Sequence, residues 1–180
     1  MLADKDHNAR VENGRKVEQF IIDKLTKSGF NTTKASDSDD MIKKVDVWLK
    51  TKSEKVGIQI KFRETGNDIL FEVFDTFYDF HDGRNKKGRD MVGEAKKYAV
   101  LINNKIVIVD KQEAKDVIEE MVQEARCNGW SKRGETSTLF YDDRGFELQL
   151  KMTRDHADGR KKMVAFIPKD YFRQSQTVAA

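Results

Sequence analysis

Two short runs of alternating apolar and polar residues, at positions 45–49 and 56–63, constrain the fold more than any other feature of the sequence. In both runs every second residue is apolar, namely Val45, Val47, Leu49, Val56, Ile58, Ile60 and Phe62. A period of two is typical of a β-strand with one buried face. Because the segment 50–55 between the runs is polar, the sequence predicts a β-hairpin with its turn near residues 51–54.

The hairpin predicts which residues meet across the two strands. With this turn, residues whose numbers sum to 105 lie opposite one another, and Asp46 and Gln59 satisfy that condition. Directly paired side chains have Cβ atoms about 5 Å apart, close enough to share one cation. Lys61 lies two residues farther along the same face, diagonally beside Asp46. We therefore expect these three polar residues on one face, and the apolar residues packed against a helix on the other.

A helix is predicted just before the hairpin, over residues 6–28, and Gly29 ends it. Its apolar residues recur at helical spacing: Val11, Val17, Ile21, Ile22 and Leu25. Glu18 lies on the same stripe, where a carboxylate is costly unless it is paired or coordinates a metal. Two interpretations stay open: Glu18 belongs to the site of the hairpin, or it pairs with Arg15 or with a strand lysine.

The rest of the chain alternates between strand and helix patterns. Further strands are predicted at 31–36, 69–74, 98–102, 106–109, 137–142, 145–152 and 162–167. A second amphipathic helix is predicted at 112–126, a polar turn at 37–40, a mobile loop at 79–94 and a frayed tail after Phe172. This order predicts an α/β fold in which helices flank a mixed central β-sheet. We expect a single domain over residues 1–175, with a core at about 8–128 and a C-terminal β extension at about 130–172.

The composition indicates the cellular compartment of the protein but not its binding partner. The 34 basic residues nearly balance the 31 acidic ones, so the net charge of +3 does not by itself indicate a polyanionic partner. The single cysteine, Cys127, excludes an intramolecular disulfide and a multi-cysteine zinc site, and it favours a reducing compartment. The sequence has neither the apolar stretch of a signal peptide nor one of membrane-spanning length, so we expect a cytoplasmic protein without membrane association.

The helix and hairpin together resemble the PD-(D/E)XK nuclease superfamily. Asp46 matches the family's aspartate, and Gln59-Ile60-Lys61 matches its acid-X-lysine triplet. The segment Gly14-Arg15-Lys16-Val17-Glu18 is similar to the start of the first helix in archaeal Holliday-junction resolvases. The resemblance covers residues from about 10 to 63. It departs from the usual pattern at Val45, where proline is common, and at Gln59, where an acid is usual and where glutamine lowers the negative charge around a cation.

The resemblance implies a function and a fold. It implies a Mg²⁺-dependent endonuclease that hydrolyses DNA phosphodiester bonds, with Mn²⁺ able to substitute, on a restriction-endonuclease-like core of order α-β-β-β-α-β with extra C-terminal strands. The expected metal ligands are Asp46, the amide oxygen of Gln59, the carbonyl of Ile60 and Glu18. The ion polarises the phosphate and activates water, while Lys61 orients that water or stabilises developing charge. A homodimer is expected, so that two sites reach two strands.

Basic residues are the expected contacts to DNA: Arg15, Arg63, Arg84, Lys86, Lys87 and Arg89. A solvated charged face is the other interpretation of such a run. Asp39 and Asp40 either supply a second metal position or form a turn. Two rival functions also stay open. One is a non-catalytic nucleic-acid-binding protein with a degenerate nuclease fold, and the other is a protein-interaction module that uses the C-terminal strands.

Overall fold

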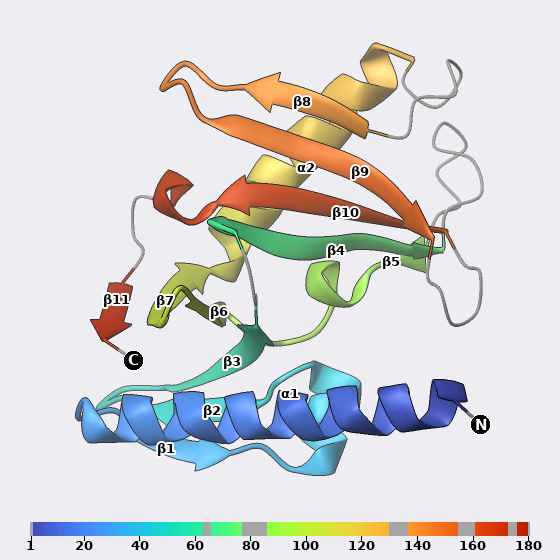
Figure 1. Ribbon diagram of the computed structural model, residues 1–180. Coiled ribbons are helices and arrows are strands. Elements are labelled where there is room, and N and C mark those ends of the chain that lie inside the picture. The colour runs from blue at the N-terminus through green and yellow to red at the C-terminus, as the bar shows by residue number, and fades with distance from the viewer. Residues whose placement is uncertain are drawn as a thin grey trace. The chain divides into compact units, whose positions relative to one another are not determined.

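The chain has a mixed α/β fold with two β-sheets and few helices (Figure 1). The computed structural model describes residues 2–62, 66–76, 86–129, 137–154, 161–172 and 176–179, with side chains at all of these except 2–11, 76, 154 and 176–179. The fold consists of two compact units. The first comprises Met1–Gly66, Glu94–Lys111 and Gln174–Ala180, and the second Asn67–Gly93 and Gln112–Arg173. The expected single domain over 1–175 stays a prediction.

The first unit contains a six-stranded mixed sheet of order β1-β2-β3-β6-β7-β11. Its strands are β1 (Asn31–Lys34), β2 (Val47–Lys50), β3 (Lys55–Phe62), β6 (Lys97–Ile102), β7 (Lys105–Asp110) and β11 (Gln176–Ala179). β3 and β6 run parallel, and the other neighbours are antiparallel. Helix α1 (Leu2–Lys27) packs on this sheet, mainly against β1 and β3. A short π-helix, η1 (Asp39–Lys43), precedes β2 (Figure 1).

Helix α1 buries the C-terminal part of the apolar stripe that the sequence predicts, while Val11 lies outside the residues whose side chains are described. Ile21, Ile22 and Leu25 are almost fully buried, and they pack in one cluster with Val47, Leu49, Val56, Ile58, Ala99, Ile106 and Ile108 of the sheet. Burying each such side chain contributes about 1.5–3 kcal/mol. The helix ends at Lys27, two residues before Gly29, whose φ of 89° favours glycine, and the Phe30 N–H donates to the Leu25 carbonyl.

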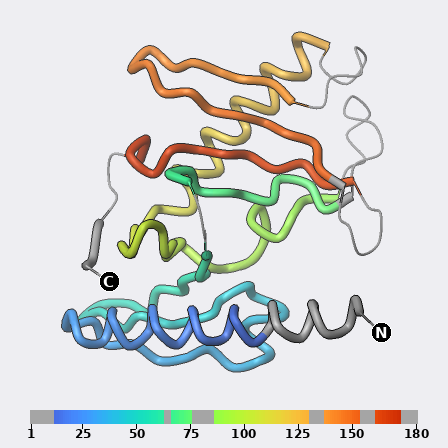
Figure 2. The backbone as a smooth tube through the Cα atoms, viewed as in Figure 1, coloured from blue at the N-terminus to red at the C-terminus, as the bar shows by residue number. Residues whose placement is uncertain are grey.

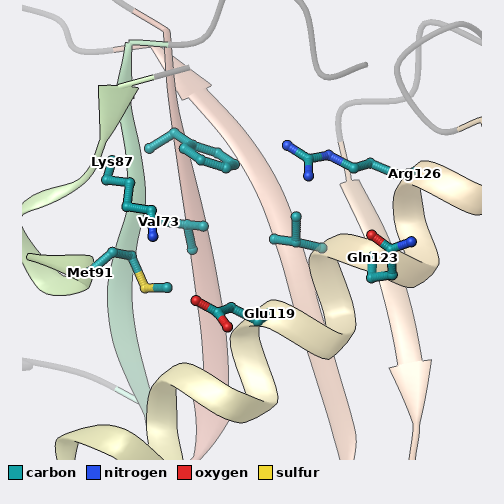
Figure 3. A pocket seen from close by; sticks show the side chains of 8 residues that line it. Val73, Lys87, Met91, Glu119, Gln123 and Arg126 are labelled. Atoms are coloured by element: carbon teal, nitrogen blue, oxygen red, sulfur yellow. The ribbon is translucent and has the colours of Figure 1, made fainter. Parts of the chain in front are cut away.

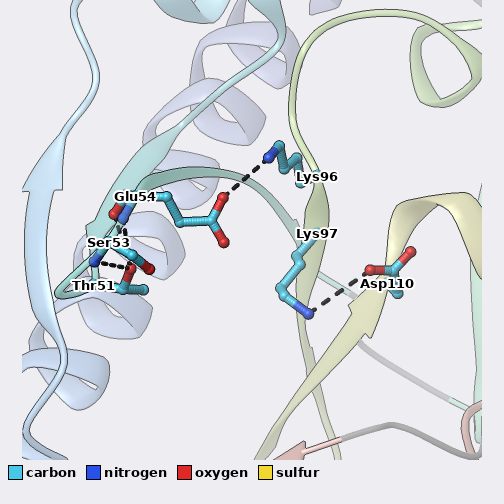
Figure 4. A network of polar contacts seen from close by, with 6 residues as sticks. All are labelled: Thr51, Ser53, Glu54, Lys96, Lys97 and Asp110. Carbon is cyan, nitrogen blue, oxygen red and sulfur yellow. Dashed lines mark hydrogen bonds and ion pairs between the residues drawn. The ribbon is translucent and has the colours of Figure 1, made fainter.

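A tight turn sets the register of the β2–β3 hairpin. The Thr51 N–H donates to the Glu54 carbonyl at 2.9 Å, and Thr51 Oγ1 accepts from the Glu54 N–H at 3.0 Å. Glu54 also pairs with Lys96 just before β6, at 3.1 Å (Figure 4). The resulting pairs, which include Val47↔Ile58 and Lys50↔Lys55, confirm the predicted register in which residue numbers sum to 105.

The second unit contains a five-stranded antiparallel sheet of order β5-β4-β10-β9-β8 (Figure 2). Its strands are β4 (Asp68–Thr76), β5 (Lys86–Lys87), β8 (Ser137–Tyr141), β9 (Glu147–Arg154) and β10 (Lys161–Pro168). It also contains helix α2 (Lys111–Cys127), except for Lys111, which belongs to the first unit. Two 3-10 helices, η2 (Arg89–Met91) and η4 (Lys169–Tyr171), complete the second unit. The core includes Phe71, Leu150 and Met163 from the sheet, and the apolar stripe of α2 is buried as predicted.

Five features differ from the expectations. The sequence predicts one central sheet, but β4 pairs with β10, so the C-terminal strands form a second sheet. Residues 86–91 form β5 and η2, whereas a mobile loop was expected, and residues 39–43 form a π-helix in place of a simple turn. The tail after Phe172 is not frayed throughout, because β11 pairs with β7. Finally, the resemblance implies the order α-β-β-β-α-β, but the described residues between β3 and β6 form β4, β5 and η2, and α2 follows β7 as the sequence pattern predicts.

No helix among the described residues is long and apolar enough to cross a membrane.

Packing of α1 on the sheet predicts a stability effect that a matched pair of variants can measure. Leu25→Ala, at a fully buried position, is expected to lower the free energy of unfolding by about 2–5 kcal/mol, because it removes apolar contact and leaves a cavity. Gln19→Ala, at an exposed position of the same helix, is expected to change it by less than about 0.5 kcal/mol. Urea denaturation measures both values. Equal effects of the two variants would contradict the packing described for α1.

Candidate functional site

Asp46 lies at a local irregularity where β2 begins. The last pair of the β2–β3 ladder is Val47↔Ile58, and the Asp46 N–H also donates to the Ile58 carbonyl, at 2.9 Å. Two consecutive residues therefore oppose one, which is the arrangement of a β-bulge. Bulges redirect side chains and are frequent beside active sites. Consequently Asp46 does not form the simple cross-strand pair with Gln59 that the sequence predicts.

The alternation of side chains breaks at the same place. Val45 was expected to share a face with Val47, but its side chain and that of Trp48 both lie within 3.3 Å of the position that a Gly57 Cβ would occupy. Val45 is therefore on the face of Trp48. An extra residue in one strand changes the face on which its flanking residues lie, which explains the difference.

The carboxylate of Asp46 contacts the triplet directly. Its Oδ2 accepts a hydrogen bond from the Ile60 N–H at 2.5 Å. A hydrogen bond from an amide to an ionised carboxylate is short and about twice as strong as a neutral one. The bond holds Asp46 against the middle residue of Gln59-Ile60-Lys61, so the aspartate and the triplet do come together, although through the backbone of Ile60.

Lys61 and Gln59 share a face of the sheet with a buried tyrosine. In the parallel β3–β6 pair, Gln59 lies next to Tyr98, which is 1% exposed. The Lys61 Nζ lies 5.4 Å from the centre of the Tyr98 ring, and the Nζ of the buried Lys111 lies 5.9 Å from it. Cations at these distances from an aromatic ring are attracted by its quadrupole. Tyr98 therefore lies beside Gln59 in the sheet and attracts two ammonium groups.

The oxygens at this place suit a hard cation. Gln59 is 2% exposed, and although the residue makes other contacts, its Oε1 accepts no hydrogen bond within the described part of the chain. Together with the Asp46 carboxylate and the Ile60 carbonyl, this amide oxygen is a donor of the kind that Mg²⁺ binds. The described residues contain no group of three or more His, Cys, Asp or Glu side chains able to hold a metal. The candidate donor set thus has one carboxylate and two neutral oxygens.

Glu18 forms an ion pair with a strand lysine. Its Oε1 lies 3.1 Å from Lys34 Nζ, and its side chain is 21% exposed. This pairing is the second of the two interpretations that the sequence allows. Lys34 lies opposite Val47, and the following residue, Ala35, donates its N–H to the Asp46 carbonyl at 3.0 Å. The strand residue opposite Lys34 is therefore the one that follows Asp46 in the sequence.

Asp39 has structural partners on both of its carboxylate oxygens. One oxygen pairs with Lys43 at 2.9 Å, and the other accepts from the Trp48 indole N–H at 3.1 Å. The hydrogen bond from Lys43, followed by that from Trp48, holds the pKa of Asp39 below its usual 3.8. These contacts fix η1 to β2 and favour a structural role over a second metal position.

The residues expected to contact DNA are distributed over both units. Arg15 is exposed on α1 of the first unit. Lys86, Lys87 and Arg89 are exposed on β5 and η2 of the second, where Lys86 pairs with Asp75 at 3.1 Å. Arg63 and Arg84 lie outside the described residues.

Sequence reasoning missed Tyr98 and Lys111. Tyr98 falls in a predicted strand, but the parallel partner of a strand is set by long-range pairing that no local pattern reports. Lys111 has the sequence signal of an ordinary first residue of a helix. No family model, curated protein or solved structure matches the chain, so the site rests on its own geometry.

The lowered pKa of Asp39 predicts an acid transition that the Trp48 indole N–H resonance can report. Because the pKa is lowered in the folded chain, the stabilisation by Lys43 and Trp48 is present above the unfolded value of 3.8 and is lost as the pH falls through the folded value. The indole resonance is expected to move with a midpoint below 3.8. Asp39→Asn should remove this titration. A midpoint at or above 3.8 would contradict the assigned contacts.

Proposed function

We propose that the chain is a Mg²⁺-dependent endonuclease of the PD-(D/E)XK type, which hydrolyses phosphodiester bonds of DNA. The observation that carries the proposal is the hydrogen bond from the Ile60 N–H to the Asp46 carboxylate. It joins the aspartate to the Gln59-Ile60-Lys61 triplet, two motifs that are separated in the sequence and that the chemistry requires side by side.

The proposed metal ligands are Asp46, the Oε1 of Gln59 and the carbonyl of Ile60. When bound, Mg²⁺ polarises the scissile phosphate and lowers the pKa of a water molecule. Asp46 supplies the negative charge of the site, and its orientation is held by the Ile60 N–H. Gln59 supplies a neutral oxygen from a buried position, so little side-chain entropy is left to lose on binding.

The proposed role of Lys61 is to stabilise negative charge on the phosphate. Its ammonium group is attracted to the Tyr98 ring, which limits its motion without neutralising its charge. A cation held in place beforehand stabilises negative charge that develops on the phosphate in the transition state. Glu18 is the proposed fourth member. Its carboxylate pairs with Lys34, whose cross-strand partner, Val47, directly follows Asp46.

The first unit supplies the proposed restriction-endonuclease-like core, in which α1 covers a sheet that includes β1, β2, β3 and β6. It departs from the α-β-β-β-α-β order because α2 follows β7. The proposal includes a homodimer, since one site cuts one strand. Arg15 and the basic residues of β5 and η2 are the proposed contacts to the DNA backbone.

Cutting of supercoiled plasmid DNA in Mg²⁺, Mn²⁺ or EDTA tests the proposal. We expect cleavage with either metal and none with EDTA. Asp46→Asn is expected to abolish cleavage while the chain stays folded, because the new amide oxygen still accepts from the Ile60 N–H. Lys61→Met is expected to lower kcat by about 10²–10³-fold. Glu54→Gln, which removes an exposed ion pair with Lys96, should leave the rate unchanged.

The products separate the remaining alternatives. Linear DNA formed without accumulation of the nicked circle indicates two sites acting together, as in a homodimer. DNA binding without cleavage in either metal would replace the enzyme by a non-catalytic nucleic-acid-binding protein. Metal-dependent cleavage that survives Asp46→Asn would show that this site is not the one that cuts.

A single substitution tests the role of Gln59. Gln59→Glu adds a second carboxylate to the proposed donor set, so the Mg²⁺ concentration for half-maximal cleavage is expected to fall by about tenfold. Without metal the same change buries a charge and should lower the melting temperature, and Mg²⁺ should reverse the loss. Gln149→Glu, on β9 of the second unit, is the control and should show no Mg²⁺-dependent recovery.

A further inference from the structure

The second unit contains a cavity of about 400 Å³ between its sheet and α2 (Figure 3). Small-molecule sites usually have volumes of roughly 300–1,000 Å³ and combine an apolar lining with a few polar groups. The wall of this cavity comes from β4, β5 and η2 on one side and from one face of α2 on the other. It is separate from the residues of the proposed nuclease site.

The wall formed by β5 and η2 is fixed to β4 by backbone contacts. A Cβ at Gly88 would lie 2.2 Å from the Glu72 carbonyl oxygen, so only glycine allows this close approach. The Gly88 N–H donates to the Val73 carbonyl at 2.8 Å. The buried carboxylate of Asp90 accepts from the Glu72 N–H at 2.6 Å. The backbone that carries Lys87 and Met91, on either side of these contacts, is therefore fixed to β4.

The floor of the cavity is apolar. Val73 and Phe74 come from β4, Met91 from η2 and Val122 from α2, and each is at most 8% exposed. A flat ring placed on these side chains would lose water contact on its face and gain dispersion contacts, including those with the Phe74 ring and the Met91 sulfur.

Charged groups reach the cavity from both walls. Lys87 extends from β5, while Glu119 and Arg126 extend from α2, where they lie two helical turns apart (Figure 3). The neighbouring Lys86 instead pairs with Asp75 at 3.1 Å. The cavity therefore combines an apolar floor with two cations and one acid.

We propose that this cavity binds a nucleoside monophosphate. The phosphate would lie against Lys87 and Arg126, since arginine binds phosphate oxygens in pairs. The apolar faces of the base would lie on the floor. An ionised Glu119 can accept hydrogen bonds but not donate them. It therefore selects a base that presents N–H donors on its edge, as guanine does. A free nucleotide and the 5′-terminal nucleotide of a DNA strand share this chemistry. The inference does not depend on the proposed nuclease function.

Isothermal titration of the full chain with dGMP tests the inference, with deoxyguanosine and inorganic phosphate as partial ligands. We expect dGMP to bind more tightly than either part alone. Lys87→Met and Arg126→Met are each expected to raise the Kd for dGMP by about tenfold or more. Lys86→Met is the matched control, because it removes the same charge from the adjacent residue, which does not line the cavity. This variant should bind dGMP with the Kd of the parent chain.

Three results would overturn the inference: no binding of dGMP at millimolar concentration, equal weakening by Lys86→Met and Lys87→Met, or inorganic phosphate binding as tightly as dGMP. Competition identifies the source of the ligand. Displacement of dGMP by a short oligonucleotide with a 5′-phosphorylated dG, and not by its 5′-hydroxyl form, assigns the cavity to a strand end. Binding of dGMP without such displacement assigns it to the free nucleotide.

Discussion

The hydrogen bond between the Ile60 N–H and the Asp46 carboxylate is the contact on which the candidate site depends. A strand N–H at the end of a ladder needs an acceptor, and here the acceptor is a side chain made available by the bulge at Asp46 and Val47. One bond therefore satisfies the backbone of β3 and fixes the only charged member of the proposed donor set. This contact in turn depends on the hairpin register, which is set by the turn at Thr51–Glu54 and by the packing of α1 on the sheet.

Burial explains why a glutamine at position 59 is physically reasonable. An acid there would bring more negative charge to a cation, but in the absence of the cation it would be a charge at a position only 2% exposed. Glutamine avoids that cost and keeps an oxygen donor. The ammonium groups of Lys61 and Lys111 beside Tyr98 add positive charge to the same face, which favours an anion such as phosphate. The proposed site thus has a metal donor set with one negative charge and, on the same face, two ammonium groups beside Tyr98.

Local patterns in the sequence predicted most elements, because the apolar periods of α1, α2 and the strands are visible within each segment. The hairpin register followed from a short turn. The sequence does not predict the bulge at Asp46, because the alternation from Val45 to Leu49 looks unbroken. The bulge is visible only in the structure, where the Asp46 N–H donates to the Ile58 carbonyl and Val45 lies on the face of Trp48. The pairing of β4 with β10, the strand β11 and the place of Tyr98 beside Gln59 depend on long-range partners. The place of Glu18 on an apolar stripe predicts that its carboxylate needs a partner, and in the structure that partner is Lys34.

A crystal structure of the chain soaked with Mn²⁺ tests the central claim most directly, because anomalous scattering locates the ion independently of the protein atoms. The account predicts one ion bound by the Asp46 carboxylate, the Gln59 amide oxygen and the Ile60 carbonyl, with Lys61 still beside the Tyr98 ring. An ion bound elsewhere, or none at these oxygens at saturating Mn²⁺, would contradict it.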